Sequence, residues 1–311
     1  MTRALISIGT NSTRLLVQDG ERRVAAESRG TRIGTGIGST GALDPAARAR
    51  TLEAIDAYVA IAREAGAGEI DAIATSALRR ASDADAFGDD VERRVGIAPR
   101  ILSGDEEATY SYLGATRTHD GAGPLGVLDV GGGSSELAVD TPAHARAAGT
   151  VRSTQSVEIG AVRLSERHQA LLGTHALLGA ERAAVEGSAR SDAQTLLLPF
   201  ASAGTIAELI VVGGTAFTAA AMVAGGLPDG AVLARADVAT LIDALFARDL
   251  EGRRALPHIR PQRADILPAG LLVIDEACRL LSVDRFTVSE SDLLLGYLTS
   301  PAFRAAAFAK R

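Results

Sequence analysis

Cysteine, lysine and long apolar runs are almost absent from this sequence. Cys278 is its only cysteine, so the chain has no partner for an intrachain disulfide and no cysteine cluster for zinc. No run of 18 apolar residues occurs, and the N-terminal segment turns polar at Gly9, too early for a signal peptide. We therefore expect a cytoplasmic protein without a membrane span or membrane partner.

Positive charge is in the minority, with 32 basic against 38 acidic residues and a net charge of −6. This balance disfavours a nucleic-acid-binding protein, which depends on phosphate contacts. Lys310 is the only lysine, so nearly all positive charge is arginine. Arginine suits phosphate and carboxylate groups, although a genomic bias toward arginine explains its abundance more simply.

The apolar pattern alternates short strands with longer helices, which indicates an α/β protein. Strands are predicted at Arg3–Ile8 and Thr13–Gln18 on either side of a tight turn, and a helix at Asp44–Glu64 that begins at an Asp-Pro cap. The remaining predicted strands are 70–74, 100–102, 125–130, 136–139, 206–212 and 286–288. The remaining predicted helices are one that follows Thr75-Ser76, one that follows Gly213–Thr215 and runs through Val223, and those at 103–113, 236–250, 267–281 and 301–311. Hairpins beside strand–helix units predict mixed sheets, and the length of 311 residues suggests two domains.

An internal repeat supports two related lobes. Residues 6–17 align without a gap to residues 128–139, so that Gly9 matches Gly131 and Ser12 matches Ser134. Each copy is a strand, a Gly/Ser turn and a strand, an arrangement that can aim backbone N–H groups at an anion. One position breaks the symmetry: the second copy has Asp129 where the first has Ser7.

Several segments together resemble the exopolyphosphatase/guanosine pentaphosphate phosphohydrolase (Ppx/GppA) family, in its short two-domain form. They are ISIGTNSTRLLV, ATSALRRASDADAF, LSGDEEATYSYLGA, VLDVGGGSSELAV, SVEIGAVRLSE, VVGGTAFTAAAM and RADILPAGLLVIDEACRLLSVDRFTVSE. The resemblance implies two actin-like (ribonuclease H-like) α/β lobes of the actin, sugar kinase and heat-shock-70 superfamily. We expect an N-terminal lobe over 1–121, a C-terminal lobe over 122–300, a cleft between them, and a helix at 301–311 that packs back on the first lobe.

The same resemblance implies the catalytic residues. Glu106 and Glu107 alone are explained by the helix dipole, which favours acidic side chains at a helix N-terminus. The family pattern places the catalytic glutamate directly before Ala, at Glu107, where it would orient and deprotonate the attacking water. Asp129 and Glu136 would hold Mg²⁺ and handle water, because Mg²⁺ prefers carboxylate and water oxygens; alternatively, Glu136 is an exposed strand residue.

Phosphate binding is expected at the turns and at one arginine. The predicted phosphate-binding residues are Gly9, Thr10, Asn11, Ser12, Arg79, Gly131, Gly132, Gly133, Ser134, Gly213, Gly214 and Thr215. The last three residues equally fit a simple strand–helix turn. Arg14 and Arg32 are further candidates, whereas Arg80 fits a solvated helix residue at least as well. The histidines show no paired spacing, and no GxSxG elbow indicates a serine nucleophile.

The expected function is release of terminal orthophosphate from inorganic polyphosphate by Mg²⁺-assisted attack of water. The alternatives are hydrolysis of the 5′-phosphate of guanosine pentaphosphate, a weakly hydrolytic sensor that binds (p)ppGpp or polyphosphate, and a sugar or acid kinase of the same superfold. Two departures from the family pattern bear on this choice: Ser7 replaces an aspartate, and Leu293–Gly296 replaces Leu-Arg-Glu-Gly. A homodimer is expected by analogy with the family.

Overall fold

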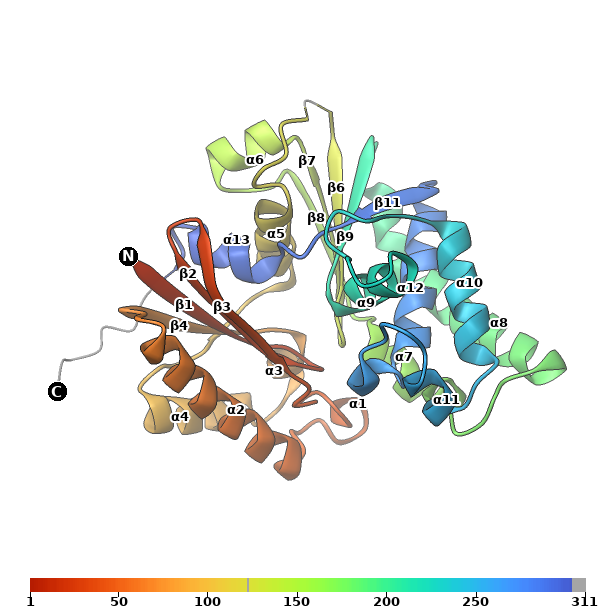
Figure 1. The fold of residues 1–311 in the computed structure, drawn as a ribbon, viewed down its shortest axis with the longest axis horizontal. Coiled ribbons are helices and arrows are strands. Elements are labelled where there is room, and N and C mark those ends of the chain that lie inside the picture. The colour runs from red at the N-terminus through yellow and green to blue at the C-terminus, as the bar shows by residue number, and fades with distance from the viewer. Residues whose placement is uncertain (122, 304–311) are drawn as a thin grey trace.

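Two β-sheets form the centres of two lobes in this computed structural model, which describes residues 1–121 and 123–303 (Figure 1). The first sheet has the order β3-β2-β1-β4-β5 and the second β10-β11-β9-β6-β7-β8. The strands of the first sheet are β1 (Thr2–Ile8), β2 (Thr13–Asp19), β3 (Arg22–Arg29), β4 (Glu69–Ala74) and β5 (Arg100–Ile101). Those of the second are β6 (Leu125–Val130), β7 (Ser135–Asp140), β8 (Ser153–Val157), β9 (Glu208–Val212), β10 (Val232–Ala234) and β11 (Arg285–Val288).

The two sheets share one connectivity. In the first, β2 runs antiparallel to β1 and β3, and β4 runs parallel to β1 and β5. In the second, β7 runs antiparallel to β6 and β8, while β9 runs parallel to β6 and β11. The short β10 adds an antiparallel edge. The predicted α/β class with two related lobes is therefore confirmed, and the repeated sequence segments are the central hairpins of the two sheets.

Helices cover the sheets and connect the lobes. They are α1 (Ile37–Thr40), α2 (Pro45–Glu64), α3 (Ser76–Arg80), α4 (Ala84–Val95), α5 (Gly104–Ala115), α6 (Pro142–Ala148), α7 (Ala161–Arg167), α8 (Gly179–Leu197), α9 (Gly214–Val223), α10 (Arg235–Phe246), α11 (Leu250–Arg254), α12 (Leu267–Leu280) and α13 (Leu293–Thr299). Single 3₁₀ turns occur at Gln169–Leu172, Leu198–Ser202 and Pro261–Arg263. No helix in the described ranges is long and apolar enough to cross a membrane.

The start of α2 follows directly from its sequence. The Asp44 carboxylate accepts a hydrogen bond from the Ala47 amide, and Pro45 occupies the first helical position, where its missing N–H is not needed. Ile55, Tyr58 and Val59 face the first sheet and join the core of that lobe. In the second lobe, the single helix predicted over 236–250 is two helices, because the Asp249 carboxylate caps a new helix through the Gly252 amide.

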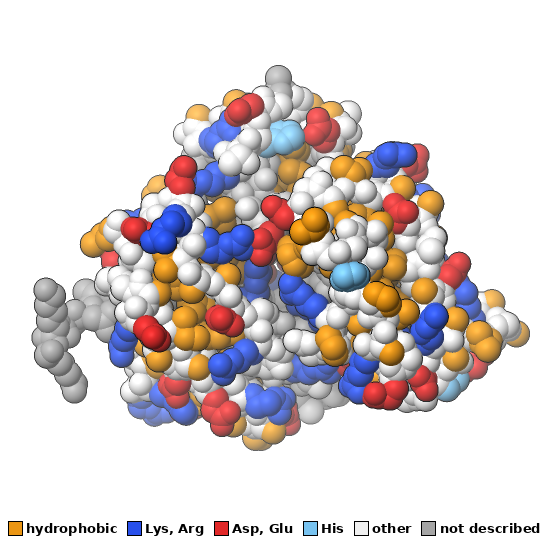
Figure 2. All heavy atoms as spheres, in the orientation of Figure 1, with side chains coloured by type: hydrophobic (Ala, Val, Ile, Leu, Met, Phe, Trp, Pro, Cys, Tyr) orange, Lys and Arg blue, Asp and Glu red, His pale blue; other side chains and the backbone are white. Residues whose placement is uncertain are grey.

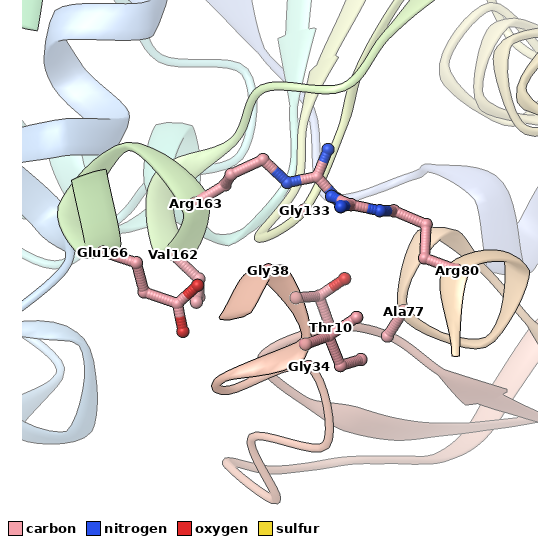
Figure 3. Close-up of a pocket in the computed structure, with 10 residues that line it drawn as sticks. Thr10, Gly34, Gly38, Ala77, Arg80, Gly133, Val162, Arg163 and Glu166 are labelled. Carbon is pink, nitrogen blue, oxygen red and sulfur yellow. The ribbon is translucent and has the colours of Figure 1, made fainter. Parts of the chain in front are cut away.

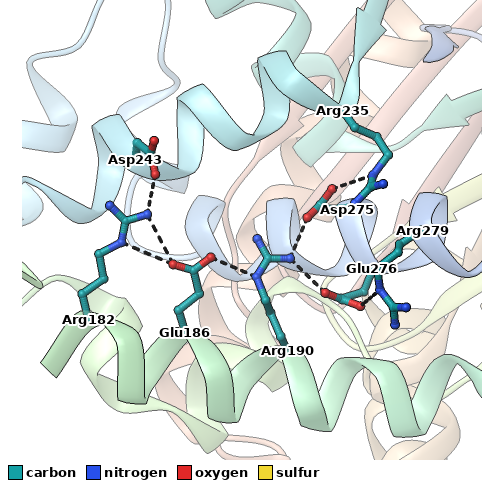
Figure 4. Close-up of polar contacts among 8 residues, drawn as sticks. All are labelled: Arg182, Glu186, Arg190, Arg235, Asp243, Asp275, Glu276 and Arg279. Atoms are coloured by element: carbon teal, nitrogen blue, oxygen red, sulfur yellow. Dashed lines mark hydrogen bonds and ion pairs between the residues drawn. The ribbon is translucent and has the colours of Figure 1, made fainter. Parts of the chain in front are cut away.

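A network of ion pairs ties together α8, α10 and α12 in the second lobe (Figure 4). Arg190 on α8 lies 2.6 Å from the carboxylate of Asp275 and 2.9 Å from that of Glu276. Both acidic side chains are about 5% exposed, so their charges depend on these partners. Asp275 also accepts from Arg235 at 2.9 Å, which extends the network to α10.

Helix α5 lies between the two sheets, and its side chains enter two cores. Tyr110 packs with the first sheet and α13, whereas Ala108 and Tyr112 pack with the second sheet. Leu294 and Leu295 of α13 replace the polar pair of the family pattern, and both join this first-lobe core, Leu294 buried and Leu295 partly buried. Residues 301–303 are turn and coil rather than helix, and 304–311, the rest of the predicted terminal helix, lie outside the described residues. The boundary predicted at residue 121 stays a prediction.

Candidate active site

The turns of the two central hairpins have matching geometry and meet between the lobes. The Gly9 amide donates to the Ser12 carbonyl at 3.0 Å, and the Gly131 amide donates to the Ser134 carbonyl at the same distance. A Cβ added to Gly132 would lie 3.1 Å from Thr10 Cβ, so the two turns are in contact. Because Gly9 and Gly131 use their amides to close the turns, they shape the turns, and the intervening residues offer amides to a ligand.

Each turn is held from behind by the segment that follows the third strand of its lobe. In the first lobe, the amides of Arg32 and Gly34 donate to the carbonyls of Asn11 and Thr10 at 3.0 and 2.9 Å. In the second lobe, the amides at residues 161 and 162, where α7 begins, donate to the carbonyls of residues 131 and 132. Since these carbonyls are hydrogen-bonded to the neighbouring segment, the turns are held rigidly, as an anion-binding turn would require.

A small cavity of about 10 Å³ lies between the turns (Figure 3). It is lined by Thr10, Gly34, Ile37, Gly38, Ala77, Arg80, Gly133, Val162, Arg163 and Glu166. Arg80 and Arg163 come from opposite lobes and point toward each other beside Gly133 (Figure 3). The sequence fits Arg80 to a solvated helix position as readily as to a ligand; the structure places it in this cavity. The space suits one water molecule, so a phosphate requires the lobes to separate here.

Glu107 and Arg79 form an ion pair beside the turns. Ser103 caps α5 in a capping box with Glu106, whose side chain bonds back to the Ser103 amide at 2.9 Å. Glu106 also pairs with Arg100, while the next residue, Glu107, is 6% exposed and pairs with Arg79 of α3. Glu106 is therefore used to cap α5, whereas Glu107 pairs with Arg79.

The Arg79 guanidinium has an unused donor. Its Nη1 also donates to the Leu102 carbonyl at 2.8 Å, which fixes the plane of the group. Its Nη2 is buried and has no hydrogen-bond partner among the described residues, although Glu158 Oε1 lies 3.7 Å away. A buried guanidinium with a free N–H group is costly without an acceptor, and phosphate oxygens would supply one.

Asp129 and Glu136 lie directly opposite each other on β6 and β7, so their side chains share one face of the sheet. Asp129 Oδ2 accepts from Ser111 Oγ at 2.7 Å, and Glu136 Oε1 accepts from Ser156 Oγ at 2.9 Å. Burial, with a contribution from the Asp292 carboxylate, raises the pKa of Asp129 to about 6. Burial and the neighbouring Asp129 charge raise the pKa of Glu136 to about 8.

This carboxylate pair fits a divalent cation. Burial and mutual repulsion destabilise the two ionised groups, and a cation between them would relieve both effects. Within residues 1–121 and 123–303, no three His, Cys, Asp or Glu side chains come close enough together to enclose a metal ion. Mg²⁺ does not need such a cage, because it keeps several waters and is commonly held by one or two carboxylates and substrate phosphates.

Gly213, Gly214 and Thr215 are divided between the site and the packing of the lobe. Gly213 has φ 94° and lies against Asp129, where a Cβ would approach Asp129 Oδ1 to 2.9 Å. Thr215 is 2% exposed and packs against Gly270 of α12. Thr215 therefore lies in a contact between α9 and α12, which fits the interpretation of this segment as a simple strand–helix turn.

Arg263 is a site residue that the sequence did not reveal. Its guanidinium lies over Gly214, and its Nη2 lies 3.4 Å from Ser12 Oγ of the first turn. Burial and the nearby charges of Arg260, Arg14 and Arg32 lower its pKa to about 10. Its position before α12 is visible in the sequence, but its approach to a turn 251 residues away is a tertiary contact.

Arginines gather in the hollow between the lobes, where basic side chains are visible in Figure 2. Two of the predicted phosphate ligands already have partners: Arg14 pairs with Asp292, and Arg32 lies 2.6 Å from Asp265. Arg79 also has a carboxylate partner, but it keeps a buried Nη2 without a hydrogen-bond partner among the described residues. This concentration of positive charge within an acidic protein suits a polyanion.

Comparisons with known proteins point to one family. The model of the Ppx/GppA phosphatase family matches residues 17–302. The chain is 33% identical to Exopolyphosphatase 2 of Mycobacterium tuberculosis, over 96% of this chain and 98% of the relative. It is 26% identical to a guanosine-5′-triphosphate,3′-diphosphate pyrophosphatase of Vibrio atlanticus, over 94% of this chain but 58% of that protein.

Solved structures are similar along the whole chain. The crystal structure of an exopolyphosphatase-like protein matches with a TM-score of 0.85 and 28% identity, over 97% of this chain and 99% of that one. An Aquifex aeolicus member of the Ppx/GppA family matches with a TM-score of 0.75 and 25% identity, over 96% of both chains.

Proposed function

Because this chain belongs to the Ppx/GppA phosphatase family, we propose that it is a phosphoric anhydride hydrolase that releases terminal orthophosphate from inorganic polyphosphate. The observation that carries the proposal is the Arg79–Glu107 pair beside the two turns. It supplies a buried carboxylate for water and a partly buried guanidinium whose buried Nη2 is an unused donor for phosphate. The near full-length similarity to an exopolyphosphatase supports the choice of substrate.

Hydrolysis assigns a task to each group. Amides of the turns and the arginines Arg79 and Arg263 hold the terminal phosphate in the cleft. A water placed by Glu107 attacks the terminal phosphorus as the bridging P–O bond breaks. Glu107 accepts the water proton, and the shortened polyphosphate leaves with the bridging oxygen. Such a loose, anionic transition state depends mainly on positioning and charge.

We further propose Mg²⁺ as the cofactor, held by Asp129 and Glu136. The ion would neutralise charge on the phosphate oxygens. The raised pKa values of the buried Glu136 and the partly buried Asp129, which lie directly opposite each other, support this choice.

Guanosine pentaphosphate remains a second candidate substrate because of a separate cavity. A cavity of about 520 Å³ borders Asn11 of the first turn. Part of its wall is apolar and includes Leu172, Leu250 and Ile266, and the rest carries polar and acidic side chains, among them Glu166, Asp249, Glu251 and Asp265. That volume accommodates a nucleoside, and apolar walls favour a base. A chain of inorganic phosphates would gain nothing from these walls.

One assay separates the candidates. We would measure phosphate release from long-chain polyphosphate and from guanosine pentaphosphate at equal phosphate concentration, with Mg²⁺ and with EDTA. The proposal expects release from polyphosphate that EDTA abolishes. Preference for the nucleotide would select the second candidate. Absence of release from both substrates, together with calorimetric binding of either, would identify a sensor rather than an enzyme.

A further inference from the structure

Asp292 occupies the point where the chain leaves the second lobe and returns to the first. It follows β11 and is the N-cap of α13, the helix that packs on α5 and the first sheet. Its Oδ1 accepts from the Leu294 amide at 3.1 Å, and its Oδ2 accepts from Arg14 Nη1. At 5% exposure, this carboxylate is buried between the lobes.

The contact with Arg14 is not required for the cap. Capping uses one oxygen and is served equally well by Asn or Ser. The second oxygen is directed at a β2 side chain 278 residues away in the sequence. Asp292 is also close enough to Asp129 for the two negative charges to repel each other. A buried carboxylate beside another carboxylate is unfavourable unless something else compensates for it.

The internal repeat shows which charge the first lobe lacks. Aligned at an offset of 122, Ser7 matches Asp129 and Arg14 matches Glu136. Each pair lies directly across its own hairpin, Ser7 opposite Arg14 and Asp129 opposite Glu136. The second lobe therefore presents two carboxylates where the first presents a hydroxyl and a guanidinium.

Arg14 without a carboxylate partner would be a competitor in the site. Its charge already acts on Asp129, since the two groups attract each other. Ser7, directly across the ladder, offers no negative charge to hold it. Arg14 paired with Asp129 would neutralise the group proposed to hold the cation.

We propose that Asp292 is a positioning residue that holds Arg14 away from Asp129 and so supplies, from the start of α13, the negative charge that Ser7 does not. Asp129 is thereby left available to a divalent cation. The inference rests on the proposed function, because it assigns Asp292 a task toward the cation of that reaction. It makes Asp292 a support for the site rather than a ligand of the ion.

The test removes the negative charge of Asp292 and then places a carboxylate at position 7 instead. Binding of Mn²⁺, used as a probe for Mg²⁺, is measured by electron paramagnetic resonance without substrate, for the unaltered protein, Asp292→Asn, and Ser7→Asp combined with Asp292→Asn. Asparagine keeps the cap, so the melting temperature should change little. The exposed Asp243→Asn is the matched control, since Asp243 pairs with Arg182 on the surface of the second lobe and lines neither cavity described above.

We expect Asp292→Asn to weaken Mn²⁺ binding at least about tenfold. It should also raise the half-maximal Mg²⁺ for hydrolysis more than it lowers turnover at saturating metal. The double variant should recover the Mn²⁺ affinity, because its new carboxylate on β1 would lie opposite Arg14. Unchanged Mn²⁺ affinity in Asp292→Asn, or no recovery in the double variant, overturns the inference.

The same experiments distinguish failure of the proposed function from failure of the inference about Asp292. If Mn²⁺ binding depends on Asp292 as expected but no polyphosphate or nucleotide is hydrolysed, the positioning role stands and the hydrolase assignment falls. If the unaltered protein binds no Mn²⁺, the cation assignment and the role of Asp292 both fall.

Discussion

The guanidinium of Arg79 on α3 donates to the carboxylate of Glu107 on α5, while its second terminal nitrogen remains buried and without a hydrogen-bond partner in the described part of the chain. The pair joins two helices of the first lobe at the edge of the cleft. In the proposed reaction, this one contact would supply a carboxylate for the water and an N–H group for the phosphate.

Replacing Glu107 by Gln should reduce turnover by about 10²–10⁴-fold with little change in KM, because a positioned base is lost while Arg79 still binds phosphate. Steady-state phosphate release measures this effect. Glu106→Gln is the control: glutamine serves in a capping box as glutamate does, so its turnover should stay near normal. Equal losses in the two variants would remove Glu107 from the mechanism.

Arg263→Met should separate stability from function. The Arg263 charge is disfavoured by burial and by three neighbouring arginines, so its removal should raise the melting temperature of the free protein by about 2 °C. The same change should raise KM for polyphosphate about tenfold, because a charge-assisted contact is lost. Surface Arg254→Met should alter neither value, and a fall in both stability and affinity would contradict this prediction.

Gly133→Ala should damage the contact between the turns. The added Cβ would lie 2.6 Å from Thr10 Oγ1 and 2.8 Å from Ser76 Oγ, too close for either neighbour to remain in place. We expect kcat/KM to fall by about 10²-fold, since small misplacements in a catalytic site have effects of that size. Gly88→Ala, which meets nothing within 4 Å in α4, should keep full activity and gain about 0.5–1 kcal/mol of stability.

Arg190→Met should destabilise the second lobe without touching the chemistry. Two carboxylates about 5% exposed would lose a shared partner, at a cost of about 3 kcal/mol in the free energy of unfolding. Urea unfolding measures the loss, and activity per folded molecule should be unchanged. Arg94→Ala, which breaks an exposed pair with Asp56, should cost less than about 1 kcal/mol.

The central hairpins, the capped helix at Asp44 and the strand–helix alternation could be predicted because their signals are local. The third strand of each lobe, β3 and β8, escaped prediction because both are sheet edges with largely exposed or half-buried polar residues. Helix α8 was missed for a related reason: only Ala189, Ala193 and Leu197 of it are buried, a narrow stripe with little apolar signal.

The residues of the candidate site also fall into those with a local sequence signal and those defined by distant contacts. Turn residues such as Gly132 and Gly133 are predicted by the repeat, and Glu107 by its family motif, because each lies within a short segment. Arg263 and Asp292 depend on contacts across 251 and 278 residues, which no local pattern encodes. The internal repeat shows only that the first lobe lacks, at Ser7, the negative charge that Asp129 gives the second lobe.

The position of α5 between the sheets has a consequence for how the molecule unfolds. Its Tyr110 belongs to the core of one sheet and its Tyr112 to the core of the other, so melting either core strips one side of the helix that carries Glu107. The lobes therefore form one cooperative unit, and calorimetry should record a single transition in spite of their duplicated design. A partly unfolded state would not retain catalysis, because unfolding of either core would displace Glu107 from the groups proposed to bind the phosphate.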